Sequence, residues 1–334
     1  MTTVALPDVI DRIGNTPLIE LTSFSHENVK LYAKLEWYNS FGSVKDRAAY
    51  WMIRNAEKKG ILKKGKSIII EPTSGNTGIA LTGIATALGY KVEIVIPEKV
   101  SNETKIILRN LGATLHETSD DLCPRVGSGT DQSIALAKAI SKPKPDLYYM
   151  PNQYENESNF LAHYESTGPE IWEQTNGKIT HFLTGCGTGG TITGTGAFLK
   201  EKDMKIQVIA IQAQKNHLLQ GLRNFEESAM PDLFKRHLTV VDDWITATNE
   251  DSFNSVKQLF EKEQLLVGPS SGSVMASMIK TAEKLESGNL VGIFADDGRK
   301  FKSLYLQQNI FSERKYETAL RNAKNLSNMP YIFS

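Results

Sequence analysis

The sequence predicts an α/β fold with two mostly parallel, twisted sheets, and three observations support this class. Segments of strand length alternate with segments of helical periodicity along most of the 334 residues. Several of the expected strands, such as SIIIEPT and KVEIVIP, are apolar nearly throughout, as strands covered on both faces are. The chain is also long enough for two domains.

The expected elements alternate in order along the chain. Apolar runs of strand length predict strands at residues 29–37, 67–73, 91–97, 113–118, 147–151, 181–186, 206–213 and 290–297. Helical periodicity predicts helices at residues 45–59, 76–88, 101–111, 130–141, 158–175, 190–201, 250–264 and 273–286, with one more helical stretch within 310–334. The segment SKPKPD at 141–146 marks a break before the second half.

Composition excludes several classes of protein. Lys and Arg total 38 and Asp and Glu also total 38, so charge gives no reason to expect a nucleic acid or an anionic membrane as partner. No apolar run approaches the length of a membrane span, and the first residues do not resemble a secretory signal. The two cysteines form no CxxC pair and the six histidines are scattered, so we expect a cytoplasmic protein without a metal site.

Residues 60–67 match the phosphate-loop pattern G-x-x-x-x-G-K-[ST], but the flanking elements are in the wrong order. A phosphate loop leaves a strand and enters a helix, whose N-terminus then faces the phosphates. Here Gly60 follows the helix expected at 45–59, where glycine is a common C-cap, and Ser67 begins a strand. We therefore interpret this match as a helix stop followed by a basic turn.

The segment that follows, PTSGNTG, has the right order, because it leaves a strand and opens a helix. It carries more hydroxyl and amide side chains than one helix cap requires, which favours an anion-binding role. These side chains are Thr73, Ser74, Asn76 and Thr77.

The segment GCGTGG at 185–190 matches G-x-G-x-x-G and also runs from a strand to a helix. A dinucleotide site needs an acid at the end of the next strand, but that strand ends in Gln212, Gln214 and Lys215. Flexible N–H groups at a helix N-terminus, with the hydroxyls of Thr188 and Thr191 beside them, still suit one phosphate. The pattern therefore indicates a cofactor with a single phosphate.

Lys45 stands at the start of an expected helix, where the helix dipole disfavours a cation. A lysine with a lowered pKa is the kind that forms Schiff bases. Around it, the sequence resembles the cysteine synthase and cystathionine β-synthase family of pyridoxal-phosphate (PLP) enzymes, of the tryptophan-synthase-β fold type. The resemblance covers about residues 8–306. It rests on IGNTPLIEL (13–21), KLEWYNSFGSVKDR (34–47), EPTSGNTG (71–78), TGPEIW (167–172), GCGTGGTITG (185–194) and VGPSSG (267–272).

The resemblance implies a role for each matching residue. Lys45 forms the Schiff base with PLP and acts as general base, Asn76 bonds the ring hydroxyl, and Ser270 faces the pyridine nitrogen. The phosphate cradle comprises Gly187, Thr188, Gly189, Gly190 and Thr191, and the substrate carboxylate is held by Thr73, Ser74, Asn76, Thr77 and Gln153.

The resemblance also implies an architecture and a reaction. The smaller domain would hold residues 40–150 with 1–12, the larger domain 151–306 with 13–39, and the tail helix 307–334, usually in a homodimer. PLP would lie between the domains. Loss of the β-substituent of an amino acid would give an aminoacrylate, to which a sulfur nucleophile adds.

The segment 214–234 is closest to family members that use O-phosphoserine, in which an arginine in an LRN context meets the substrate phosphate. That residue is Arg223, and a forked guanidinium suits a phosphate better than an acetyl ester. An ordinary surface arginine, paired with Glu226 or Glu227, is the other interpretation, and Lys215 and His217 are weaker candidates.

We therefore expect a cysteine synthase that prefers O-phospho-L-serine over O-acetyl-L-serine and uses sulfide. A cystathionine β-synthase, a serine or threonine deaminase and a binding protein on the same fold are the alternatives. We expect Asp296 and Asp297 to order a loop around the cofactor, and Cys186 to be a packing residue in the phosphate loop.

Overall fold

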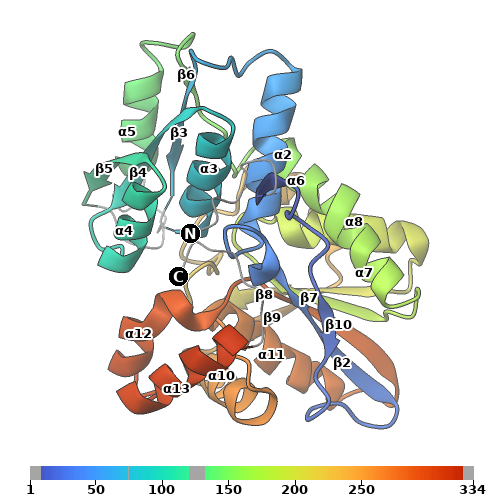
Figure 1. Ribbon diagram of the computed structural model, residues 1–334. Coiled ribbons are helices and arrows are strands. Elements are labelled where there is room, and N and C mark those ends of the chain that lie inside the picture. The colour runs from blue at the N-terminus through green and yellow to red at the C-terminus, as the bar shows by residue number, and fades with distance from the viewer. Residues whose placement is uncertain (1–8, 74, 120–131, 326–334) are drawn as a thin grey trace.

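The computed structural model describes residues 9–73, 75–119 and 132–325, with side chains to residue 321. Two separate sheets organise it, as Figure 1 shows. The larger has the order β1-β2-β10-β7-β8-β9 and the smaller the order β5-β4-β3-β6. Every strand pair is parallel except β1 with β2. The expected α/β class with two largely parallel sheets is therefore confirmed.

The strands have the following bounds. The larger sheet contains β1 (Leu18–Glu20), β2 (Val29–Leu35), β7 (His181–Gly185), β8 (Gln207–Ala213), β9 (Asp243–Ala247) and β10 (Gly288–Phe294). The smaller sheet contains β3 (Ile68–Pro72), β4 (Lys91–Pro97), β5 (Ala113–Thr118) and β6 (Tyr148–Tyr149).

The helices follow one another along the whole described chain. In the first half of the chain they are η1 (Glu36–Tyr38), α2 (Lys45–Lys58), α3 (Asn76–Ala87), α4 (Asn102–Asn110) and α5 (Gln132–Ser141). Next come α6 (Glu157–Ala162), η2 (His163–Thr167), α7 (Gly168–Gln174), α8 (Gly190–Lys202), α9 (Asp232–Arg236) and η3 (Leu238–Val240). The last are α10 (Asn249–Glu263), α11 (Pro269–Ala282), η4 (Gly298–Phe301), α12 (Lys302–Gln307) and α13 (Glu313–Asn325).

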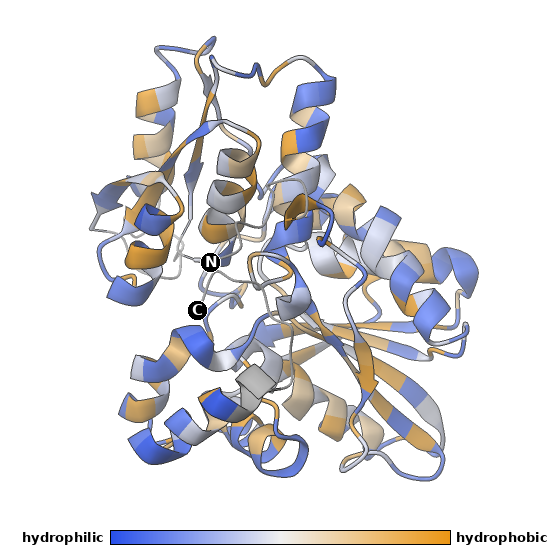
Figure 2. Ribbon diagram, in the orientation of Figure 1, coloured by the Kyte–Doolittle hydropathy of each residue, from blue (hydrophilic) through white to orange (hydrophobic). Residues whose placement is uncertain are grey.

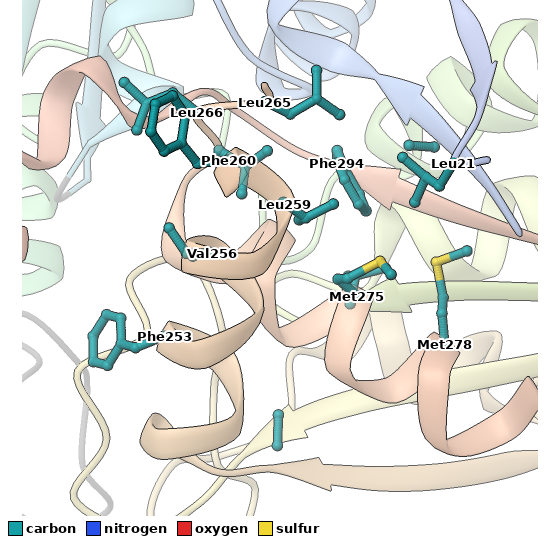
Figure 3. Packing of buried hydrophobic residues seen from close by; sticks show 14 of the residues in the cluster. Leu21, Phe253, Val256, Leu259, Phe260, Leu265, Leu266, Met275, Met278 and Phe294 are labelled. Carbon is teal, nitrogen blue, oxygen red and sulfur yellow. The ribbon is translucent and has the colours of Figure 1, made fainter. Parts of the chain in front are cut away.

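Each sheet has its own hydrophobic core. The core of the smaller sheet joins α2 and α3 to β3 and β4. The core of the larger sheet includes Leu259 on α10, Met275 and Met278 on α11, and Phe294 on β10, which belong to the cluster of buried side chains in Figure 3. In Figure 2 helices such as α4 and α13 show a hydrophilic side and a hydrophobic side, as amphipathic helices on a core do. α2 packs on α3, which covers the smaller sheet, and on α6, which packs on α8 beside the larger sheet. It therefore connects the helices of the two sheets.

The sequence-based expectations need correction at two helices and at four short elements that they did not include. The helix expected at 158–175 is α6, the π-helix η2 and α7 in succession; a π-helical turn accommodates an extra residue. The helix expected at 273–286 begins at Pro269, because Gly268 is extended and proline suits the first helical turn. The short edge strands β1 and β9, and the short helices α9 and α12, were not expected. The other expected elements are present, with ends that differ by at most three residues.

Candidate active site

Most predicted site residues follow the carboxyl ends of parallel strands, where ligands of open α/β sheets bind: β3, β6, β7 and β8 precede them. Ser270 is different, because it lies at the start of α11. Lys45 is the first residue of α2. The segment before it is tied to the end of β10, since Val44 N–H donates to Ala295 O at 2.9 Å and Ser43 forms a bridge with Asp296. Among the described residues, the amine of Lys45 has no hydrogen-bond or ion-pair partner. Burial lowers the pKa of Lys45, and the charge of Asp296 opposes this effect.

Asn76, the first residue of α3, reaches from the smaller sheet to the loop after β10. Its Nδ2 donates to Asp296 Oδ2 at 2.8 Å, and Lys300 Nζ donates to its Oδ1. Lys300 Nζ also lies 3.3 Å from Asp296 Oδ2. Lys300 carries donors only and an ionised carboxylate carries acceptors only, so these two partners fix which way the amide points. The orientation leaves the second hydrogen of Nδ2 for a ligand.

The turn after β3 and the segment before α6 meet in a second contact between predicted site residues. Thr77 Oγ1 donates to Gln153 Oε1 at 2.7 Å, and both side chains are buried. Thr73 is buried at the end of β3, and Ser74 lies outside the described residues. Beneath them Glu71 accepts hydrogen bonds from the N–H groups of Asn152 and Gln153 at 2.8 and 3.0 Å. Burial raises the pKa of Glu71 to about 7, although these two N–H groups oppose the shift.

Residues 187–191 form a tight loop at the N-terminus of α8. Gly189 has φ of +90°, and a Cβ on it would come within 2.4 Å of Phe234 Cβ. A Cβ on Gly187 would lie 2.7 Å from Gly221 O, and one on Gly190 would lie 2.2 Å from Asn159 Oδ1. Larger residues would therefore not fit. Within the described chain the N–H groups of residues 187–189 have no hydrogen-bond acceptor, as expected for an anion cradle at a helix N-terminus.

Two side chains on neighbouring segments support the hydroxyls of this cradle. Asn159 Nδ2 donates to Thr188 Oγ1 at 2.9 Å and to Gln153 O at 2.9 Å, so it links the cradle to the predicted carboxylate site. Thr191 Oγ1 lies 3.2 Å from His163 Nε2, and Thr167 Oγ1 lies 2.9 Å from His163 Nδ1. Burial, followed by the charges of Arg47 and Lys45, lowers the pKa of His163 well below its usual value. His163 is therefore neutral at physiological pH.

Ser270 lies in the first turn of α11 and is buried, and its hydroxyl has no partner among the described residues. The next residue, Ser271, donates its hydroxyl to Asp296 O at 3.2 Å. This contact places the Ser270 segment beside the Lys45 and Asn76 segments. Cys186 is buried next to the cradle, and burial raises the pKa of its thiol to about 12, consistent with a packing role.

Arg223 lies beside both the cradle and the segment that carries Gln153. Its backbone N–H donates to Cys186 O at 2.9 Å, and its guanidinium lies over the ring of Tyr154 at 4.8 Å. The pairing with Glu226 or Glu227 that a surface arginine would make is not observed. Glu226 pairs with Lys215 at 2.6 Å, and Glu227 accepts from Asn216 N–H. Within the described chain the Arg223 guanidinium has no carboxylate partner.

Sequence reasoning missed Glu71, Asn159 and His163, which hold the predicted residues in place. Glu71 carries a local signal, because a carboxylate at the end of the apolar run SIII is unusual and needs a partner. Asn159 and His163 carry no such signal. Each contacts a threonine hydroxyl at the N-terminus of α8, about thirty residues further along the chain.

The residues present fit pyridoxal phosphate. The glycine loop leaves room for one phosphate. Its N–H groups, the Lys45 amine and the Ser270 hydroxyl have no partner in the part of the chain that the structure describes. The comparison with known families agrees: the chain belongs to the family of pyridoxal-phosphate-dependent enzymes, whose model matches residues 9–296.

Within this family the chain is homologous to cysteine synthases and cystathionine β-synthases, and it catalyses a PLP-dependent β-replacement of that type. A cysteine synthase of Aquifex aeolicus is 41% identical over 315 residues, 92% of each chain. A cystathionine beta-synthase of Apis mellifera is 38% identical over 321 residues, 92% of this chain and 62% of that protein. The crystal structure of an O-ureido-L-serine synthase superposes with a TM-score of 0.83 at 29% identity, over 93% of this chain and 98% of that one.

The described residues lack two further features. None of the helices there is long and apolar enough to cross a membrane. In the same residues, three or more His, Cys, Asp or Glu side chains do not gather into a group that could hold a metal ion.

Proposed function

We propose that the protein makes L-cysteine from sulfide and an activated serine, and that it prefers O-phospho-L-serine to O-acetyl-L-serine. The observation that carries the preference is the Arg223 guanidinium, which has no carboxylate partner in the described chain and lies over Tyr154. An arginine left unpaired next to a substrate site is available to bind an anion in a two-pronged geometry.

The other proposed roles follow from the contacts of each residue. Lys45 holds the cofactor and then moves the proton of the substrate Cα through its Nζ. The cradle at 187–191 binds the cofactor phosphate, Asn76 donates to the ring hydroxyl, and the Ser270 hydroxyl meets the ring nitrogen. When bound, the cofactor spreads the negative charge that develops at Cα. The carboxylate of the substrate is held by Thr73, Ser74, Asn76, Thr77 and Gln153.

The test compares kcat/KM for the two serine derivatives, with sulfide as the nucleophile. Loss of a charge-assisted contact in Arg223→Ala should lower kcat/KM for phosphoserine by about 10- to 100-fold and change that for acetylserine much less. Arg223→Lys keeps the charge but loses the fork, so its loss should be intermediate. Arg109→Ala, which removes an exposed arginine paired with Glu117, is the matched control. A phosphoserine preference that survives in Arg223→Ala contradicts this role.

A cystathionine β-synthase activity is the second candidate, favoured by the similarity to the Apis mellifera protein. Replacing sulfide by homocysteine in the same assay distinguishes the two, because only the second candidate requires turnover with homocysteine. The two-domain boundaries, the homodimer and the cytoplasmic location stay predictions.

A further inference from the structure

Asp296 lies where three segments of the candidate site meet. Its backbone oxygen accepts from Gly268 N–H at 3.0 Å and from the Ser271 hydroxyl, and its backbone pairs with Ser43, two residues before Lys45. The side chain is 2% exposed. The sequence suggested only that this residue orders a loop, but its position ties together the segments that carry the cofactor residues.

The two carboxylate oxygens of Asp296 differ in their surroundings. Oδ2 has two partners, Asn76 and Lys300, whereas Oδ1 is buried and has no hydrogen-bond partner among the described residues. A Cβ on Gly268 would come within 2.0 Å of Oδ1, so the glycine is what leaves room for this oxygen. An unpaired buried acceptor costs about 1–3 kcal/mol and more for a charged group, so it calls for a reason. Among the described residues, the neutral hydroxyl of Thr195 is the other fully buried side-chain atom without a partner.

Lys45 lies two residues after Ser43, the residue whose backbone pairs with that of Asp296. The amine of Lys45 has no partner within the described chain, and its charge interacts with that of Asp296. We propose that Asp296 is a positioning residue whose Oδ1 accepts a hydrogen bond from the Lys45 ammonium. This contact forms at the stage when the lysine is free of the cofactor and carries the substrate proton. This inference rests on the proposed role of Lys45 as the base.

The step balances without any further reactant. The bond between the substrate Cα and its hydrogen breaks, its electron pair stays on the substrate side, and a new N–H bond forms at Lys45 Nζ. Asp296 takes up no proton in this step. Burial raises the pKa of Asp296, and the charge of Lys300 and the hydrogen bond from Asn76 oppose that shift and favour the ionised form. Its effect is to stabilise the ammonium product of the transfer, which strengthens the lysine as a base.

The remaining charged and titratable groups around Lys45 leave Asp296 as its counter-ion. Arg47 is paired with Glu36 and Glu170, and His163 is neutral. Lys300 is already paired with Asp296 Oδ2. The neighbouring Asp46 directs its carboxylate at the Phe41 N–H and the Ser43 hydroxyl, and burial raises its pKa to about 7.

The experiment follows proton transfer in the full-chain holoenzyme. The rate of the cofactor absorbance change after mixing with O-phospho-L-serine is measured across pH by stopped flow. In the wild type the rate should rise with pH as Lys45 loses its proton. Asp296→Asn removes the anion that favours the ammonium, so the rising limb should move to lower pH by about one unit or more, and the plateau rate should fall.

Two variants separate this effect from general disruption. Asp297→Asn removes an equally buried carboxylate one residue away, which pairs with Arg299, and should leave the limb in place. Lys300→Met removes a cation, so any shift should be to higher pH. The proposal is overturned if Asp296→Asn leaves the limb unmoved, if Asp297→Asn shifts it equally, or if Lys300→Met shifts it downward. Release of phosphate from O-phospho-L-serine at the wild-type rate in Lys45→Ala would instead overturn the proposed role of Lys45.

Discussion

Lys45 and Arg47 are two residues apart in the first turn of α2, yet their side chains end in opposite environments. Arg47 is 1% exposed and donates at 2.6 to 3.1 Å to Glu36, Glu170, Ser166 and Thr16. The amine of Lys45 has no partner in the described chain. A buried cation whose donors are all bonded fixes structure, whereas one left without partners is free to act on a ligand.

The Arg47 cluster connects elements that are distant in sequence. Glu36 follows β2, Glu170 belongs to α7, and Lys34 on β2 donates to Glu170 Oε2 at 2.7 Å. The cluster therefore fixes the start of α2, and with it Lys45, against the larger sheet. We expect variants in the Arg47 cluster to change the free energy of unfolding, and variants around Lys45 to change cofactor chemistry. Three experiments test this difference.

The largest expected effect is that of Arg47→Met. It leaves the fully buried Glu36 without its main partner, so the free energy of unfolding should fall by about 3–5 kcal/mol. Urea denaturation of the full chain measures this. Arg54→Met, which breaks an exposed pair with Glu57, should cost less than about 1 kcal/mol. If Arg47→Met does not fold, the double variant with Glu36→Gln should recover part of the lost free energy of unfolding. An equal loss in Arg47→Met and Arg54→Met would contradict the structural role of Arg47.

The next effect is a dependence of stability on pH. Burial raises the pKa of Glu170, but the hydrogen bond and charge of Arg47, and then Lys34, lower it to about 2 from 4.5. This carboxylate stabilises the fold above about pH 4.5, and its contribution is lost as the pH falls towards 2. The contribution is on the order of 2–3 kcal/mol. Glu170→Gln should therefore flatten the fall in urea midpoint between neutral and acid pH.

The matched control for that variant is Glu165→Gln, which removes an exposed carboxyl from the same region. Its pH dependence should follow the wild type. A Glu170→Gln protein whose urea midpoint falls as steeply as that of the wild type would show that the cluster is not held by this charge.

The smallest of the three effects concerns the cradle. Thr191→Val removes the hydroxyl that lies 3.2 Å from His163 Nε2 and that faces the proposed phosphate site. Loss of about one hydrogen bond should weaken cofactor binding about tenfold, with little change in unfolding free energy. Equilibrium dialysis of the cofactor measures the binding. The control is Thr195→Val, one turn further on α8. It removes a buried hydroxyl that has no partner among the described residues, so it should leave cofactor affinity unchanged. An equal loss of cofactor affinity in the two variants would argue against a specific role for Thr191.

Much of the fold could be predicted from sequence because its strands are long apolar runs and its helices are strongly periodic. β1 and β9 were not predicted because they are short edge strands. β9 also contains the polar residues Asp243 and Thr246, so it lacks a continuous apolar signal. The π-helix η2 was not predicted because its close packing on α8 is a contact across space: a Cβ on Gly194 would lie 2.9 Å from His163 Cβ.

The candidate site could be predicted only where its residues lie in local motifs. Lys45, Asn76 and the loop at 187–191 belong to such motifs, and the structure brings their segments together. Arg223 rested on a resemblance alone. The unpaired Oδ1 of Asp296 has no sequence signal at all, since it results from three segments meeting in space. No pattern in FADDGRK distinguishes Asp296 from Asp297, although one contacts Asn76 and the other pairs with Arg299.

We expect the lysine at the start of α2, whose amine has no partner in the described chain, to be the one that holds the cofactor. Reducing the holoenzyme with borohydride makes the bond between lysine and cofactor permanent, and peptide mass mapping then locates it. The added mass should be on Lys45 and should be absent in Lys45→Ala. Attachment to another lysine, such as Lys300 or Lys34, or no attachment in a protein with bound cofactor, would contradict it.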